Sequence, residues 1–381
     1  MELLLPSLDL NRQSQASSGF HVGVSFCGNT TAQAKLLIDR VKNFTNLLVI
    51  QSGPVSVNET ALNEIVDYAT ASGLDVIAYF GYFNPLYSWQ VPWLDYAKKQ
   101  WGSRFLGVYL HDEPAGQVID YNWTGYLTQL KISDVQAYYS HVPGIDLELN
   151  GSLPIDNADA GYHFNVHVEN DLGLNQLESR SITSFTSDYA LYWFDYLGGY
   201  DTIFAEFGSN ASISQTVALA RGAARMQNKN WGTIITWTYD QPPYIVNGSE
   251  LYNELMTAYM AGAQYVAIFD YPQIDDNPYG ILTDEHFTAL EKFWNNIQTL
   301  TPNNQAQAAL VLPHDYGWGM RYPQDTLWGL WKPDATTAQI WGVSRKLEAQ
   351  YGLGLDIVYD DPMFPVQGKG YKQIYYWNQT L

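Results

Sequence analysis

The sequence FHVGVSF at residues 20–26, followed by AQAKLLIDRV at residues 32–41, opens a series of short apolar runs that alternate with helical patterns. Such alternation is typical of a parallel sheet whose strands are connected by helices. Eight runs rich in apolar, β-branched and aromatic residues are predicted as strands: Phe20–Phe26, Asn46–Gln51, Leu74–Phe80, Phe105–His111, Ser184–Asp188, Thr202–Glu206, Thr233–Tyr239 and Tyr265–Asp270. This number predicts a (β/α)8 TIM barrel.

Helices are predicted in five of the connections: Ala32–Val41, Ala61–Ala71 with Asn58 or Thr60 as its cap, Ser212–Gln227, Leu251–Ala261 and Asp284–Leu300. The connection at about residues 112–183 is too long for one helix and predicts an excursion or extra helices. In an alternative interpretation Tyr162–Val168 is also extended, which gives nine runs and moves Glu206 from the sixth strand to the seventh.

A second, smaller domain is predicted after the barrel. The strand pattern restarts beyond Thr301, and Pro302 marks the boundary. Strands at Ala308–Leu312, Leu355–Tyr359 and Gln373–Tyr376 and a helix at about Thr336–Tyr351 predict a small flavodoxin-like α/β domain. The expected organisation is an N-terminal extension at 1–18, a barrel at 19–301 and the small domain at 302–381. No Gly-rich phosphate motif follows the first strand of that domain, so we expect no nucleotide cofactor.

Charge and composition exclude several classes of function. The chain has 39 acidic and 19 basic residues, a net charge of -20. Nucleic-acid binding requires clustered Lys and Arg, and the sequence has no such cluster. Cys27 is the single cysteine, so neither a disulfide within the chain nor a Cys-based metal site can form. We expect no cofactor and no metal, and no run is long and apolar enough to span a membrane.

Several features favour a secreted or cell-surface protein. Tyr, Trp and neutral polar residues take the place of charge, with 29 Tyr and 13 Trp. Asn-x-Ser/Thr sequons begin at Asn29, Asn43, Asn58, Asn122, Asn150, Asn210, Asn247 and Asn378. Residues 1–6 lack the basic start and long apolar stretch of a signal peptide, so an exported form is expected to have lost its signal.

Carboxylates follow five of the predicted strands. They are Asp112 and Glu113, Asp188, Glu206, Asp240 and Asp270. In a TIM barrel the carboxyl ends of the strands form the active site, so these groups are expected to converge. Converging carboxylates repel one another, which raises at least one pKa and prepares a general acid for glycosidic cleavage.

Aromatic and polar side chains near the same strand ends predict a sugar site, because flat rings pack on the CH faces of sugars. The expected substrate-binding residues of the barrel are His111, Tyr109, Asp188, Trp193, Trp237, Tyr239 and Asp270. Trp89 and Trp93 are interpreted as loop residues of this aromatic set. A Trp-rich loop of the second domain, with Trp318, Arg321 and Trp331, is expected to reach over the barrel mouth or to fill the domain interface.

The strand-four ending, His111-Asp-Glu-Pro114, resembles the Asn-Glu-Pro ending that carries the acid/base in the large barrel clan of retaining glycoside hydrolases. The second domain is similar to the amidotransferase-like domain of some barrel β-galactosidases. The resemblance implies that Glu113 is the acid/base. The nucleophile of that clan is a Glu ending strand seven, whereas this chain has Trp237-Thr-Tyr-Asp240 there and its Glu on strand six. Glu206 and Asp240 are therefore both candidate partners.

Strand alternation predicts that Tyr109, His111 and Glu113 share the inner face of the barrel, while Asp112 lies in a second layer or caps the loop. The function predicted from these observations is hydrolysis or binding of an oligo- or polysaccharide. Two alternatives remain open: a non-catalytic carbohydrate-binding or cell-envelope protein on the same barrel, and a metal-dependent hydrolase with carboxylates and His111 as ligands.

Overall fold

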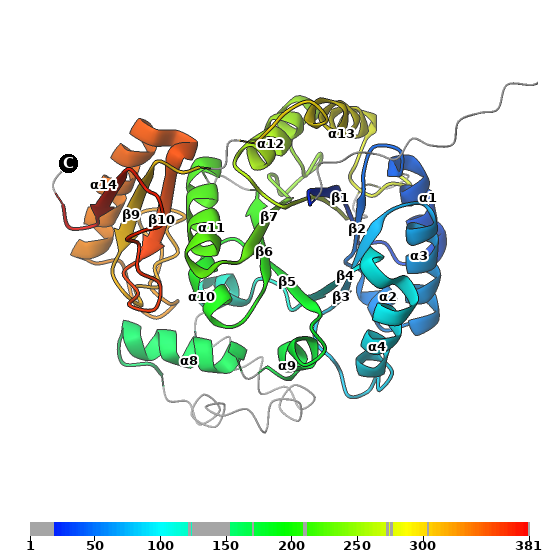
Figure 1. Ribbon diagram of the computed structural model, residues 1–381, viewed down its shortest axis with the longest axis horizontal. Coiled ribbons are helices and arrows are strands. Elements are labelled where there is room, and N and C mark those ends of the chain that lie inside the picture. Colours follow the sequence, from blue (N-terminus) through cyan, green and yellow to red (C-terminus); the bar gives the residue numbers. More distant parts are fainter. Residues whose placement is uncertain are drawn as a thin grey trace, which may run out of the picture.

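The computed structural model describes residues 19–120, 123, 153–169, 171–208, 212–271, 274, 277–302 and 305–379, and its main body is a closed barrel (Figure 1). Eight parallel strands pair in chain order, and the eighth pairs with the first. The strands are β1 (His21–Phe26), β2 (Leu47–Ile50), β3 (Asp75–Phe80), β4 (Phe105–Leu110), β5 (Thr183–Asp188), β6 (Thr202–Phe207), β7 (Asn230–Ile235) and β8 (Tyr265–Asp270). The predicted (β/α)8 barrel is confirmed.

The seventh strand differs most from its prediction, since it ends at Ile235 rather than at Tyr239. Two residues later the chain turns back on itself, because the amides of Thr238 and Tyr239 both donate to the carbonyl of Tyr244. Apolar and β-branched residues continue through this turn, which is why the sequence pattern extended the strand. Trp237, Tyr239 and Asp240 consequently lie in a loop.

Helices surround the barrel (Figure 1). They are α1 (Thr31–Val41), α2 (Gly53–Ser56), α3 (Glu59–Ala71), α4 (Gln90–Trp101), α8 (Asn157–Glu169), α9 (Leu172–Glu178), α10 (Tyr192–Leu197), α11 (Ile213–Gln227), α12 (Gly248–Met260) and α13 (Asp284–Ile297), with short 3-10 turns at Gly102–Arg104 and Gly352–Gly354. Tyr162–Val168 lies within α8, so its interpretation as extended chain is wrong. The long connection holds helices, as expected. No helix in the described ranges is long and apolar enough to cross a membrane.

The core has two layers. Inside the barrel, inward side chains fill the interior: Leu47, Val49, Ile77, Tyr109, Phe185, Phe204, Ile234 and Ala267. A larger apolar layer lies between the strands and the helices. Trp93 of α4 belongs to that outer layer, since it is 1% exposed and packs against Phe80 and Phe105. Trp89 also packs on Phe80. The interpretation of Trp93 as a loop residue is therefore wrong, whereas Trp89 lies in the turn before α4, and neither side chain lines the cavity described below.

The small domain contains a three-stranded parallel sheet in the order β10-β9-β11, formed by β9 (Ala308–Leu312), β10 (Leu355–Tyr359) and β11 (Gln373–Tyr376), with α14 (Ala335–Tyr351) before β10. It packs beside α11 and α10 (Figure 1). Arg221 of α11 donates to the buried Asp356 at 2.7 Å, and Gly222 lies so close that a Cβ would meet the Ile357 carbonyl oxygen at 2.5 Å. This contact fixes the small domain against the barrel.

The described sequon asparagines are all exposed: Asn29, Asn43, Asn58, Asn247 and Asn378. Asn58 and Asn247 also cap helices α3 and α12. The other three sequons lie outside the described residues. Cys27, directly after the first strand, is buried.

Candidate active site

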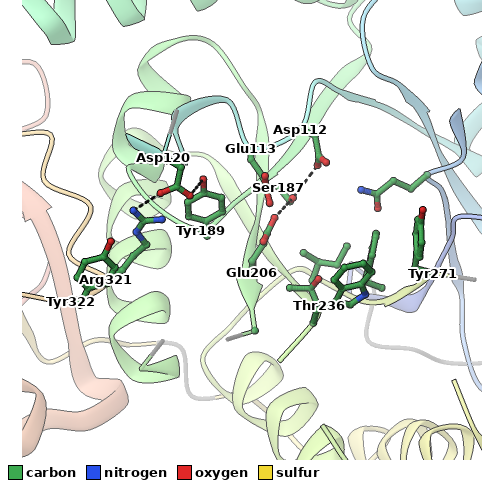
Figure 2. A pocket seen from close by; sticks show the side chains of 15 residues that line it. Asp112, Glu113, Asp120, Ser187, Tyr189, Glu206, Thr236, Tyr271, Arg321 and Tyr322 are labelled. Carbon is green, nitrogen blue, oxygen red and sulfur yellow. Dashed lines mark hydrogen bonds and ion pairs between the residues drawn. The ribbon is translucent and has the colours of Figure 1, made fainter. Parts of the chain in front are cut away.

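A cavity of about 980 Å³ opens at the carboxyl ends of the barrel strands (Figure 2). It is lined by Gln51, Asp112, Glu113, Asp120, Ser187, Tyr189, Glu206, Gly208, Ile234, Thr236, Trp237, Phe269, Tyr271, Arg321 and Tyr322. Carboxyl groups occupy its centre, and aromatic side chains lie around them (Figure 2). This is the end of a TIM barrel at which catalytic groups are placed.

Glu113 enters the cavity because the backbone leaves strand geometry after Leu110. His111 and Glu113 have positive φ values of 58° and 52°, a region that non-glycine residues adopt at a cost. Glu113 is held in this geometry by its amide, which donates to the Ser187 carbonyl at 3.0 Å. Residues 114–120 are helical, with Pro114 at the first position, where its missing N–H costs nothing.

Asp188 supplies the cap for this helix. Its carboxylate accepts the amides of Ala115 and Gly116 at 2.8 and 3.0 Å, and also those of Tyr189 and Ala190. A Cβ on Gly116 would lie 2.6 Å from an Asp188 oxygen, so only glycine permits this approach. Asp188 is fully buried and outside the cavity lining. The structure therefore does not bring Asp188 to the cavity as predicted, because backbone amides occupy its oxygens.

The same turn changes the neighbours of Glu113. Strand alternation ends at Leu110, so Asp112 joins Glu113 in the cavity, and its prediction as a second-layer residue is wrong. His111 does not line the cavity. Its Nε2 lies 3.1 Å from Asp171, the N-cap residue of α9. The prediction that His111 shares the side of Glu113 is therefore also wrong.

Glu206 comes from β6 and lies in the barrel axis above Phe204, two residues earlier on the same face. Its Oε1 accepts from Ser187 Oγ at 2.6 Å, and its carboxyl shares a hydrogen bond with Glu113. Figure 2 shows the Glu113 and Glu206 side chains close together. The two carboxyls that the sequence assigned to separate strands thus form a direct pair.

Burial controls the protonation of this pair. It raises the pKa of Glu113 to about 7, and the neighbouring carboxyls Asp112 and Asp188 add to the effect when they are ionised. Burial also raises the pKa of Glu206 well above its ordinary value, with a further contribution from Glu113. The two titrations are linked because each negative charge opposes the other. Near neutral pH the pair therefore retains a proton that could be donated.

One side of the cavity comes from the second domain. Arg321 forms a bidentate pair with the buried Asp325 at 2.9 and 2.8 Å, and its guanidinium also lies 2.7 Å from Asp120 of the barrel. Asp120 accepts from Tyr189 at 2.7 Å (Figure 2). Tyr322 follows Arg321 in the cavity lining. The structure therefore brings Arg321 of the predicted loop to the cavity, whereas Trp318 and Trp331 lie outside its lining.

The other side carries exposed aromatic rings. Trp237 and Tyr271, each 36% exposed, meet edge to face at 5.5 Å and both line the cavity. Tyr239 is 45% exposed but lies outside the lining, and so does the exposed Asp240. Trp237 is thus brought to the site, whereas Tyr239 and Asp240 are not.

Other predicted residues serve the protein interior. Trp193 is 3% exposed and packs on Tyr359 and Phe364 of the second domain, and Trp318 is buried in that domain with its Nε1 bonded to the Asp325 carbonyl. Asp270 is buried and accepts the Ile281 amide at 2.9 Å. Tyr109 is fully buried below the cavity floor. The structure does not bring these four predicted residues to the cavity, because each side chain lies outside its lining.

Several cavity residues were not predicted: Gln51, Ser187, Thr236, Asp120 and Tyr322. The first three had a usable signal, since each lies two residues after an inward residue of its own strand: Val49, Phe185 and Ile234. Asp120 and Tyr322 come from connections whose path the sequence pattern does not determine. Among the residues that the structure describes, no three His, Cys, Asp or Glu side chains are arranged to hold a metal ion. The donor set of a metal-dependent hydrolase is thus not found there.

No protein-family model matches the chain, and no curated protein matches its sequence. The solved structures that it is similar to include a GH5_18 protein from Streptomyces cattleya in complex with GlcNAc, at 12% identity, with 94% of this chain and 98% of that chain covered and a TM-score of 0.51. A GH5_18 protein from Bifidobacterium longum subsp. longum gives 11% identity, coverage of 95% and 98%, and a TM-score of 0.54. A variant of that protein was solved with Manb1-4GlcNAc, at 10% identity, coverage of 94% and 96%, and a TM-score of 0.51. The chain shares their fold. The likeness covers the barrel and the small domain together.

Proposed function

We propose that the protein is a retaining glycoside hydrolase acting on an oligo- or polysaccharide, with Glu113 as acid/base and Glu206 as nucleophile. The observation that carries the proposal is the Glu113–Glu206 pair, two carboxyls in direct hydrogen-bond contact in an open cavity. Retaining enzymes hold their carboxyls about 5–5.5 Å apart, whereas inverting enzymes need about 6.5–9.5 Å to admit a water between them. The close approach of the two side chains (Figure 2) is what favours retention.

The two carboxyls have unequal environments, which supports unequal roles. Glu113 stands on the helix-capping turn, with a pKa of about 7, and is suited to protonate a leaving-group oxygen near neutral pH. Glu206 rises from the barrel axis and receives a hydrogen bond from Ser187 that supports its ionised form. In the clan that the strand-four motif resembles, the nucleophile ends strand seven. Here the inward side chain at that strand end is Thr236, and Glu206 approaches the same acid/base from β6.

The cavity lining supports a sugar that carries no negative charge. Asp112, Glu113, Asp120 and Glu206 give the site an acidic character, and the one cation among the described lining residues, Arg321, is already paired with two carboxylates. Ionised carboxylates in this lining would repel an anionic sugar. Trp237, Tyr271 and Tyr322 offer exposed ring surface for pyranose faces. The sugars in the neighbouring structures, GlcNAc and Manb1-4GlcNAc, make N-acetylhexosaminides and mannosides the first candidates.

An extracellular location is part of the proposal. Its support is the low-charge, Tyr-rich composition and the exposure of the described sequon asparagines. Glycosylation at an exposed Asn needs no rearrangement of the fold. Mass spectrometry of the protein purified from its own cells tests this part, since glycan masses on the sequon peptides support it and unmodified sequons contradict it.

Hydrolysis of a panel of aryl glycosides and neutral oligosaccharides tests the proposal, with wild type, Glu113→Gln and Asp240→Asn compared. Gln keeps the shape of Glu113 but cannot deliver a proton, so the loss is expected at about 10²- to 10⁴-fold in kcat/KM. Asp240→Asn removes a carboxylate outside the cavity and should leave the rate unchanged. Binding of sugars without turnover by the wild type would contradict the proposal and favour the binding or envelope alternative.

A further inference from the structure

Four oxygen atoms form a chain in the floor and wall of the cavity. Glu206 Oε1 lies 2.6 Å from Ser187 Oγ, and Ser187 Oγ lies 2.7 Å from Tyr109 Oη. Tyr109 Oη is in turn hydrogen-bonded to Asp112 Oδ1. Ser187 also makes a longer contact with that Asp112 oxygen at 3.5 Å (Figure 2). Tyr109 and Ser187 are 0% and 1% exposed, so their two hydroxyls are largely shielded from bulk solvent.

The number of hydrogens in this chain is limited. Three successive bonds need three hydrogens, and the two hydroxyls of Ser187 and Tyr109 supply two. If Asp112 and Glu206 were both ionised, Ser187 would donate to Glu206 and Tyr109 to Asp112. The two hydroxyl oxygens would then meet at 2.7 Å with no hydrogen between them. One of the two carboxyls therefore carries the third hydrogen.

The bond between Glu113 and Glu206 adds one more hydrogen bond to the chain and so requires one more hydrogen. Four bonds now need four hydrogens, so two of the three carboxyls are protonated. One arrangement satisfies every bond and leaves Glu206 ionised: Glu113 donates to Glu206 directly, while Asp112 donates to Tyr109, Tyr109 to Ser187 and Ser187 to Glu206. Glu206 then receives a hydrogen from each side. This is the state that a retaining reaction needs.

We propose that Asp112, Tyr109 and Ser187 are positioning residues that hold one proton away from Glu206, so that Glu206 is ionised while Glu113 is protonated. This proposal rests on the proposed function of the Glu113–Glu206 pair. When the proton is on Glu206, it passes to Ser187 as Ser187 passes its own to Tyr109 and Tyr109 to Asp112. Three O–H bonds break and three form, and the negative charge moves from Asp112 to Glu206. No proton enters or leaves the site.

The surroundings of Asp112 agree with a proton on it. The titratable groups that face it are Tyr109 and Glu113 of its own segment, Tyr79 of β3, Cys27 after β1 and Glu206 of β6. None of these groups is a cation. Burial raises the pKa of Asp112, although its bonds with Tyr109 and Ser187 oppose this. A second charge beside Glu206 therefore has no counter-ion to stabilise it.

Infrared titration of the free protein, with no sugar present, tests the proposal independently of hydrolysis. The spectrum of wild type minus that of Asp112→Asn, at mildly acidic pH, should contain the carbonyl band of a protonated carboxylic acid. Tyr109→Phe should reduce this band, because Asp112 loses its acceptor. A carboxylate band in the wild-type difference would show Asp112 to be ionised and would overturn the proposal, whatever the protein does to sugars.

The pH profile gives a second readout on any aryl glycoside that the wild type hydrolyses. Asn at 112 donates to Tyr109 as the protonated acid does, so Asp112→Asn should keep the alkaline limb of kcat/KM in place. Ser187→Ala and Tyr109→Phe break the chain and should lower kcat by about ten- to a hundredfold with KM nearly unchanged. If Asp112 is instead ionised, Asp112→Asn removes a negative charge beside Glu113 and moves the alkaline limb to lower pH. That shift would overturn the proposal.

Discussion

The strand-end carboxyls of the barrel divide into two kinds. Asp188 and Asp270 are buried, and backbone amides occupy their oxygens. Glu113 and Glu206 lie in the cavity, where each carboxyl faces the other. All four lie at or just after the carboxyl end of a strand, and all four have raised pKa values because of burial. A raised pKa therefore does not identify the catalytic groups. What separates the two kinds is whether the oxygens are free to meet a ligand.

The largest expected effect of this division is on catalysis. Glu206→Gln should lower kcat for any glycoside that the wild type hydrolyses by at least about a thousandfold, because the nucleophile is lost. Asp270→Asn, at a strand end of the other kind, should leave kcat within about threefold per folded molecule. Steady-state kinetics on circular-dichroism-matched samples compares them. Equal losses of kcat in the two variants would show that the cavity carboxyls and the capping carboxyls do not differ in their catalytic roles.

The next effect is on stability, and here the buried capping carboxylates matter most. Asp188→Ala leaves four backbone amides without their acceptor, so the free energy of unfolding should fall by about 3 kcal/mol or more. Asp240→Ala changes an exposed loop carboxylate and should stay within about 0.5 kcal/mol of wild type. Chemical denaturation measures both. A stable Asp188→Ala protein would show that the helix after β4 does not depend on this cap.

A pH-dependent effect is expected at Asp195, which is fully buried beside Asp188. Burial raises its pKa well above the ordinary value, with a further contribution from the Asp188 charge. The folded state thus binds its proton more tightly than the unfolded chain, so the stability it contributes is present below about pH 4 and is lost as pH rises toward the folded pKa. Asp195→Asn should match wild type in acid and exceed it at neutral pH. A constant difference in melting temperature across this range would contradict the assignment.

The smallest effect concerns sugar contacts. Trp237→Ala removes ring surface from the cavity and should lower kcat/KM by about tenfold, equivalent to about 1.4 kcal/mol. Tyr239→Ala, two residues later and similarly exposed, should have no effect because its ring lies outside the lining. The pair separates sugar stacking from general damage to the loop, since equal losses would point to the loop.

The architecture followed from the sequence because hydrophobic periodicity repeats in every unit. The predicted helix at Asp284–Leu300 is found as α13, with Phe287, Leu290, Phe293 and Ile297 buried, and β9, β10 and β11 coincide with their predicted ranges. Periodicity failed where tertiary contacts overrode it. The β7 pattern continued into the turn at Tyr244, and α4 was taken for a loop because Pro92 and several aromatic residues obscured its helical stripe.

The site was predicted in outline and corrected in detail. Glu113, Glu206 and Trp237 lie in one cavity, because strand ends and the loops after them converge in any TIM barrel, and Arg321 reaches it from the second domain. Asp112 lines the cavity beside Glu113, where the sequence predicted His111, and His111 lies outside the lining. Strand alternation assumes β geometry, whereas the positive φ values at His111 and Glu113 turn the chain at that point. Ser187, the bridge to Glu206, carried no motif and could be found only from its position two residues after Phe185.

Labelling with a panel of activated deoxyfluoro glycosides tests the central claim most directly, because these compounds trap the glycosyl-enzyme intermediate of a retaining enzyme. Mass spectrometry of the digested protein should find one glycosyl group on the peptide that contains Glu206, and no label in Glu206→Gln. Asp112→Asn should still be labelled at Glu206. A label on another carboxyl, or hydrolysis with inversion and no label, would contradict the account of Glu206 as nucleophile and Glu113 as acid/base.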